Sequence, residues 1–128
     1  MRNGVHGIYL KDKRVLLVKK KDFWILPGGK PDFFEETDKQ VLKIKFKEEL
    51  SGTEILTGIY YKTFQGIIPH KKDLFFSKTY FCYIMGQVGE PSSEISAVRY
   101  VDGKSFEDLN LSEITKKTLQ SLVKDNLI

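Results

Sequence analysis

Two features of the sequence combine residue types and spacing that suit chemistry on phosphates. The first is the Pro27-Gly28-Gly29 turn, and the second is the adjacent pair Glu48-Glu49. On a helix, positions 45, 48 and 49 fall within an arc of roughly 100°. Adjacent carboxylates beside a buried helix face repel each other unless a hard cation such as Mg²⁺ binds them, although a solvated surface pair is the commoner occurrence. The pattern therefore indicates a candidate metal and phosphate site.

The segment that contains both features resembles the Nudix box. That family's pattern is Gly-x5-Glu-x7-Arg-Glu-U-x-Glu-Glu-x-Gly-U, with U apolar, entered through a Pro-Gly-Gly turn, and it matches residues 29–52 here. Anchoring the match on the helix places Glu48 and Glu49 on the paired glutamates and Glu36 on the loop glutamate. Anchoring it on the glycines places Glu35 there instead, and the sequence leaves this choice open.

The match departs from the family pattern at two places. Ile44-Lys45 stands where the family has Arg-Glu, and Ser51 stands where it has the final glycine. The resemblance implies that the lost Glu is a metal ligand and sometimes the base, and that the lost Arg braces the loop glutamate. Lys45 can partly take the place of a divalent ion beside the acidic pair. Because losing a positioned acid or base costs roughly 10²–10⁴ in rate, we expect weak or altered catalysis.

The resemblance implies Mg²⁺- or Mn²⁺-assisted hydrolysis of a nucleoside diphosphate linked to another group. Water would attack a phosphorus atom while the metal neutralises the developing charge. The implied metal ligands are Glu48, Glu49 and the Gly29 carbonyl, and the first two are also catalytic candidates. Glu94, six residues before Tyr100, is a further catalytic candidate, with Glu90 as the alternative. The residues that would support the motif are Gly28, Glu36 and Lys45.

Other residues have weaker claims on the ligand. Trp24, Phe64 and Tyr80 could stack on a nucleobase, although aromatics at strand spacing usually belong to the core. The run Lys19-Lys20-Lys21 could attract phosphates or form a solvated edge. His70 is a candidate base in a loop or an exposed histidine.

A rival interpretation belongs to a different functional class. A Nudix-fold module could bind a nucleotide or an RNA end without hydrolysing it. Nothing in the sequence specifically indicates RNA. A partner-binding domain without a nucleotide site is a third interpretation. Lys45 separates the first two, because it stands where the family has a catalytic carboxylate.

Apolar patterning predicts the elements that must position these residues. A helix is expected from the capping box of Thr37 and Gln40 to about Leu50, with a buried stripe at Leu42 and Phe46. A second helix is expected within 110–127, capped by Ser112. Strands are expected at 4–10, 14–20, 23–26, 54–64, 74–85 and 95–101, with a loop at 65–72. His6 is expected to be structural and Cys82 buried and inert.

Composition limits the remaining choices. The chain has 128 residues, 41% of them hydrophobic and 30% charged, with a formal net charge of +4. We expect one domain over 1–128, an α/β (α+β) sandwich of the Nudix type with a mixed sheet between helices. One cysteine excludes an intrachain disulfide, and no apolar run suits a membrane span or a signal peptide. We therefore expect a cytoplasmic protein without membrane contact. A homodimer is compatible with the sequence but not indicated by it.

Overall fold

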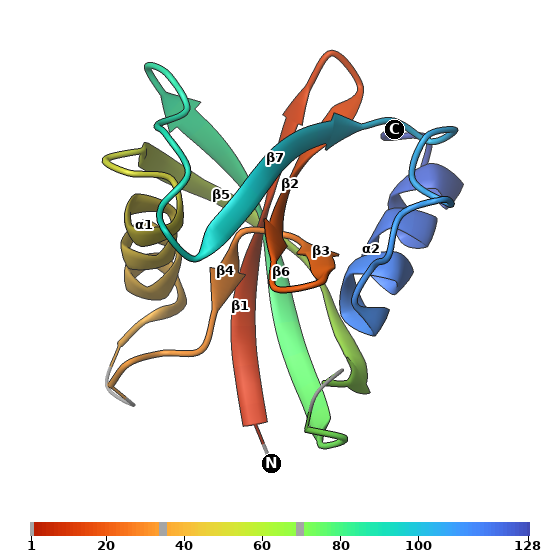
Figure 1. Ribbon diagram of the computed structural model, residues 1–128, viewed down its shortest axis with the longest axis horizontal. Helices are drawn as coiled ribbons and strands as arrows, with labels where there is room; N and C mark the ends of the chain where they lie inside the picture. Colours follow the sequence, from red (N-terminus) through yellow and green to blue (C-terminus); the bar gives the residue numbers. More distant parts are fainter. Residues whose placement is uncertain (1, 34–35, 69–70) are drawn as a thin grey trace.

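The protein is a mixed β-sheet with one helix on each side (Figure 1). A computed structural model describes residues 2–33, 36–68 and 71–128, and Glu35 and His70 lie outside this described part. The elements follow in the order β1 (Arg2–Lys11), β2 (Arg14–Lys20), β3 (Phe23–Ile25), β4 (Gly28–Gly29), α1 (Asp38–Glu49), β5 (Glu54–Ile67), β6 (Leu74–Met85), β7 (Ile95–Val101) and α2 (Glu113–Lys124). The predicted mixed sheet between helices is confirmed.

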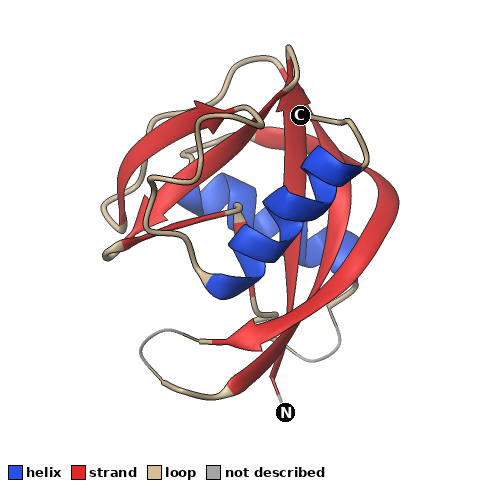
Figure 2. Ribbon diagram, turned by 90° about the vertical axis from the view of Figure 1, so that its right-hand side faces the viewer, coloured by secondary structure: helices blue, strands red, loops and turns tan. Residues whose placement is uncertain are grey.

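The first strand connects the two halves of the sheet. The hydrogen-bonded order is β3-β2-β1-β6-β5, while β4 pairs with β1 and β7 pairs with β2. Residues 2–9 of β1 run parallel to β6, and Leu10 and Lys11 pair antiparallel with β2. The strands curve strongly around the helices in Figure 2. Because β1 changes partner along its length, the sheet divides into two wings with β4 on the edge of one of them.

Side-chain caps define where both helices begin. The Thr37 hydroxyl accepts from the Gln40 amide, and the Gln40 side chain accepts from the Thr37 amide, so the predicted capping box forms. Ser112 caps α2 in the same way through the amide of Thr115. Within the described ranges, neither helix is long and apolar enough to cross a membrane.

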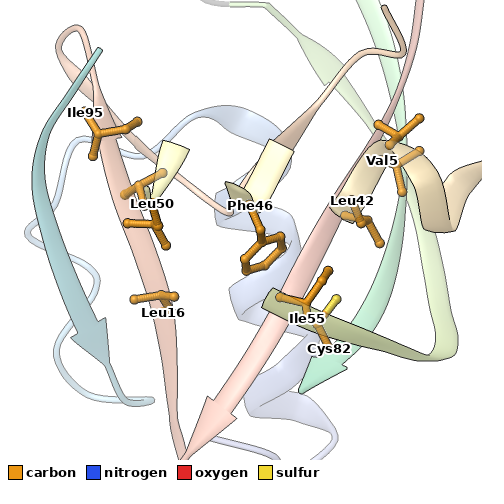
Figure 3. Packing of buried hydrophobic residues seen from close by; sticks show 10 residues of the cluster. Val5, Leu16, Leu42, Phe46, Leu50, Ile55, Cys82 and Ile95 are labelled. Atoms are coloured by element: carbon orange, nitrogen blue, oxygen red, sulfur yellow. The ribbon is translucent and has the colours of Figure 1, made fainter. Parts of the chain in front are cut away.

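Each helix packs on its own face of the sheet. Leu42 and Phe46 of α1 and its C-cap Leu50 are fully buried in one core cluster with strand residues, where Leu42 lies near Val5 and Leu50 near Leu16 and Ile95 (Figure 3). On the opposite face, α2 contributes Leu119 and Leu122 to a second core with residues of β1 and β2. Burying side chains of this size contributes roughly 1.5–3 kcal/mol each, which fixes both helices, and with them the acidic end of α1, against the sheet.

Two predicted boundaries are wrong. Strand β5 continues to Ile67 because residues 63–67 pair with 74–78 of β6, so the loop is shorter than the predicted 65–72. Gly28 and Gly29, predicted only as a break, form the short strand β4 against Val5 and His6. The first error reflects the pairing of β5 with the neighbouring strand β6, and the second reflects the pairing of β4 with the distant strand β1.

Candidate functional site

A cavity of about 460 Å³ lies beside β4, between the acidic end of α1 and the start of α2. Among the described residues, its lining contains four lysines and four carboxylates: Lys20, Lys30, Lys45 and Lys71, with Asp32, Glu48, Glu49 and Glu94. The apolar lining residues are Ile25, Ile67, Ile68, Phe75 and Ile114. A ligand with both anionic groups and an apolar or aromatic body suits a lining of this composition.

Strand β4 connects the Gly-Gly turn to α1. A Cβ atom on Gly28 would lie 2.2 Å from the carbonyl oxygen of Val5, and its φ of +145° also favours glycine. The close approach directs the Gly28 N–H to the Glu49 carboxylate, with 3.1 Å between N and Oε1. The turn and the acidic pair predicted from the sequence therefore meet at one point of the fold.

Glu49 is 2% exposed and titrates far from its usual range. Burial raises its pKa to about 7, and the nearby charge of Glu94 acts in the same direction. The Gly28 N–H and the charges of Lys20 and Lys45 oppose this shift without cancelling it. Glu49 can therefore change protonation near neutral pH, as a general acid or base must.

Lys45 occupies the middle of the acidic group. Its Nζ lies 2.9 Å from Oδ1 of Asp32 and 3.7 Å from Oε2 of Glu48. Burial opposes its charge, but the hydrogen bond to Asp32 and the negative charge of Glu48 outweigh that effect and raise the pKa of Lys45. The lysine is therefore a permanent cation among these carboxylates at neutral pH.

Glu94 reaches the cavity from the loop before β7. Its Oε2 lies 3.7 Å from Nζ of Lys20, and both side chains are partly exposed. Lys20 thus belongs to the site, while the neighbouring Lys19 pairs with Trp24 and does not line the cavity. Glu90, the alternative to Glu94, also lies away from it and accepts the Ser51 N–H through its backbone carbonyl.

Glu36 organises the loop between β4 and α1. Its Oε1 accepts hydrogen bonds from the amides of Asp32, at 2.7 Å, and Phe33, at 3.1 Å. This geometry suits the loop-supporting role expected of Glu36. Asp32 is held on both sides, because its carboxylate binds Lys45.

The carboxylates around the cavity have partners within the protein. In the described part of the chain, no three His, Cys, Asp or Glu side chains form a group that could hold one. Glu48 and Glu94 each have a lysine partner, and Glu49 accepts a backbone N–H. The Gly29 carbonyl oxygen lies 3.2 Å from the Cβ position of Gly4, toward β1. The metal site expected from Glu48, Glu49 and the Gly29 carbonyl stays a prediction.

The three aromatic residues expected to stack on a nucleobase do not line the cavity. Trp24 alternates with Ile25 along β3, so it faces the second core while Ile25 faces the cavity. Tyr80 lies on the α1 face, where its hydroxyl donates to Asp38. Phe64 contacts the ring of Tyr61. For Trp24, the reason is that adjacent strand residues point to opposite faces.

Two cavity residues carried no recognisable signal in the sequence. His6 was expected to be only structural, and its Nδ1 lies 2.5 Å from the Ser77 hydroxyl, but its ring also lines the cavity. Burial lowers its pKa to about 4, and the charge of Lys20 adds to this. Phe75 joins it through the parallel pairing of β1 with β6, and Lys30 lies 5.8 Å above the Phe75 ring. The pairing of β1 with β6 brings His6 and Phe75 together.

Solved structures share this fold across nearly the whole chain. The E. coli ORF135 protein superposes with a TM-score of 0.81 at 19% identity, over 98% of this chain and 92% of that one. A MutT Nudix hydrolase from Burkholderia pseudomallei superposes with a TM-score of 0.76 at 24% identity, over 93% and 95%. The chain has the Nudix hydrolase fold.

A third similar structure is that of an ADP-ribose pyrophosphatase. The ADP-ribose pyrophosphatase from Streptococcus suis superposes with a TM-score of 0.70 at 22% identity, over 95% of this chain and 87% of that one. No protein-family model matches the sequence, and no curated protein matches it either. The similarity of this chain to known proteins therefore rests on three-dimensional structure, at low sequence identity.

Proposed function

We propose that this chain is a Nudix-fold module that binds a nucleoside diphosphate linked to another group and turns it over slowly or not at all. The observation that carries the proposal is Lys45, whose ammonium group lies between Asp32 and Glu48. The Nudix resemblance assigns a catalytic carboxylate to this position. A lysine there suits phosphate binding but cannot ligate a metal or act as the expected base.

The shape and chemistry of the cavity support this ligand class. The four lysines of the lining suit a diphosphate, and the apolar lining residues with Phe75 suit the body of a nucleoside. The similar structure named an ADP-ribose pyrophosphatase supports the same class. Ser112 and Thr115, at the start of α2, add hydroxyl groups to the cavity wall.

The binding experiment compares ligands and one matched pair of variants. ADP-ribose and UDP-glucose, each in EDTA, are expected to raise the melting temperature of the wild type and to bind with 1:1 stoichiometry in calorimetry. Lys20→Gln is expected to weaken binding at least fivefold, because it removes a cavity cation and leaves Glu94 unpaired. Lys19→Gln, on the opposite face of the same strand, is the control. No melting shift with any nucleotide favours a domain without a nucleotide site.

A second candidate function is metal-dependent hydrolysis of the same ligands at ordinary enzymatic rates. Glu49 favours it, because a buried carboxyl group with a pKa raised to about 7 can accept or donate a proton at the cavity wall. Glu48 and Glu94 would then be the neighbouring catalytic groups. Product release with Mg²⁺ or Mn²⁺ at ordinary enzymatic rates, abolished by Glu49→Gln and by Glu48→Gln, would establish this function and overturn the binding-only proposal.

A further inference from the structure

The position of Lys45 is fixed from several sides. The aliphatic chain of Lys45 packs against Gly29, whose Cβ position is 3.5 Å from Cε and 3.6 Å from Cδ. The side chain is 16% exposed, and its Nζ donates to Asp32 at 2.9 Å. Asp32 is itself anchored, because Glu36 accepts its backbone N–H. The side chain of Lys45 is therefore held in place by the protein and does not extend freely into solvent.

Three carboxylates of the cavity lining already have a lysine partner within the described residues: Asp32, Glu48 and Glu94. The lining contains equal numbers of lysines and carboxylates. A divalent ion placed beside Glu48 would lie within a few ångströms of the Lys45 ammonium and would be repelled by it. Binding would also require Asp32 and Glu48 to give up their present partner.

We propose that Lys45 is a built-in cation that excludes divalent metal from the acidic end of α1. One residue on this helix therefore decides whether the site accepts a metal ion. The inference does not depend on the proposed nucleotide ligand, because it concerns the metal and the protein alone. Substituting Lys45 by glutamate should remove the repulsion and add a carboxylate beside Asp32, Glu48 and Glu49.

The experiment is a titration of Mn²⁺ without nucleotide, with free Mn²⁺ measured by electron paramagnetic resonance. Wild type is expected to show no stoichiometric site below about 1 mM Mn²⁺, a concentration at which binding is weak. Lys45→Glu is expected to bind one Mn²⁺ at least tenfold more tightly, and Glu48→Gln in that background is expected to reverse most of the gain. Circular dichroism checks that each variant is folded.

Two further variants make the test specific. Lys43→Glu makes the same change in charge on an exposed position of the same helix and is expected to leave Mn²⁺ binding unchanged. Lys45→Gln removes the cation without adding a ligand and is expected to give a smaller gain, which decides the question if Lys45→Glu does not fold. A wild-type site as tight as that of Lys45→Glu would overturn the proposal. So would equal gains in Lys43→Glu and Lys45→Glu, or no gain in a folded Lys45→Glu or Lys45→Gln.

Discussion

The carboxyl group of Glu49 is buried in the folded protein and exposed to water in the unfolded chain. Its pKa is about 7 when folded, against the ordinary value of 4.5, so the folded protein holds a proton that the unfolded chain has lost. The contribution of Glu49 to the free energy of unfolding is therefore full below pH 4.5 and is lost as pH rises to about 7. The expected loss is about 3 kcal/mol.

His6 has the opposite effect over much of the same range. Its pKa is lowered to about 4 from 6.5, so the unfolded chain binds a proton that the folded protein does not. Its contribution is lost as pH falls from 6.5 to about 4. Between pH 4.5 and 6.5 the two residues oppose each other, and wild-type stability should change little on their account.

Glu49→Gln separates these two effects, because it removes the titratable carboxyl group and leaves His6 in place. The glutamine oxygen can still accept the Gly28 N–H. We expect the variant to gain stability over wild type as pH rises, so that its free energy of unfolding increases between pH 4.5 and 6.5. Urea unfolding at several pH values measures both curves. Parallel curves for wild type and Glu49→Gln would contradict the raised pKa.

Cys82 provides a residue-scale test away from the cavity. The side chain is 2% exposed, and burial raises the pKa of its thiol to about 12. Because the thiolate is the reactive form, a disulfide reagent should react with the native protein at least 100-fold more slowly than with the protein in urea. Absorbance of the released thiol measures both rates. Equal rates would mean that the thiol is accessible in the folded state.

The elements were largely predictable where their signals are local. The capping box of Thr37 and Gln40 and the four-residue spacing of Leu42, Phe46 and Leu50 define α1 without any distant contact. The hydrogen bond between the Gly28 N–H and Glu49 joins the two features that the sequence pattern indicated, while their functional roles stay predictions. By contrast, the contribution of β4 to the sheet depends on Val5, which is more than twenty residues away.

Thr37→Ala tests the local origin of α1. The substitution removes the acceptor for the Gln40 amide, and we expect it to lower the free energy of unfolding by about 1 kcal/mol. Ser112→Ala should have a similar effect at the start of α2. Urea denaturation measures both. Unchanged stability in the two variants would show that tertiary packing alone determines these helix starts.

Gly28→Ala tests the close contact between β4 and β1. The new Cβ atom would overlap the backbone oxygen of Val5, and the positive φ of Gly28 disfavours any side chain. We expect a loss of at least about 1 kcal/mol of stability, together with a changed environment for Glu49, whose partner is the Gly28 amide. Thermal denaturation measures the loss. A melting temperature equal to that of wild type would contradict the tight packing of this turn.

At the scale of the whole molecule, much of the cavity could not be predicted from the sequence. His6, Lys20 and Phe75 line it because β1 pairs with β6 and β2 lies beside them, and no local pattern encodes that arrangement. Trp24 lies away from the cavity because alternation along β3 turns it to the face opposite Ile25. The acidic end of α1 was predictable, since a helix presents residues 45, 48 and 49 together.

The balance of charge gives a further whole-molecule prediction. The chain carries a net charge of +4, and lysines line the cavity beside paired carboxylates. Binding of a diphosphate ligand should therefore weaken several-fold between low and high salt, because exposed charges are screened. Calorimetric titrations with ADP-ribose at about 50 and about 300 mM NaCl measure the change. Salt-independent affinity would contradict phosphate recognition by these lysines.

The most direct measurement of the central claim is calorimetric titration of wild type with ADP-ribose, once in EDTA and once in Mg²⁺. If Lys45 and the other cavity lysines supply the positive charge, the two dissociation constants should agree within about threefold, and the ligand should be recovered intact after the Mg²⁺ titration. Binding that requires Mg²⁺, accompanied by conversion of ADP-ribose to its hydrolysis products, would contradict the account.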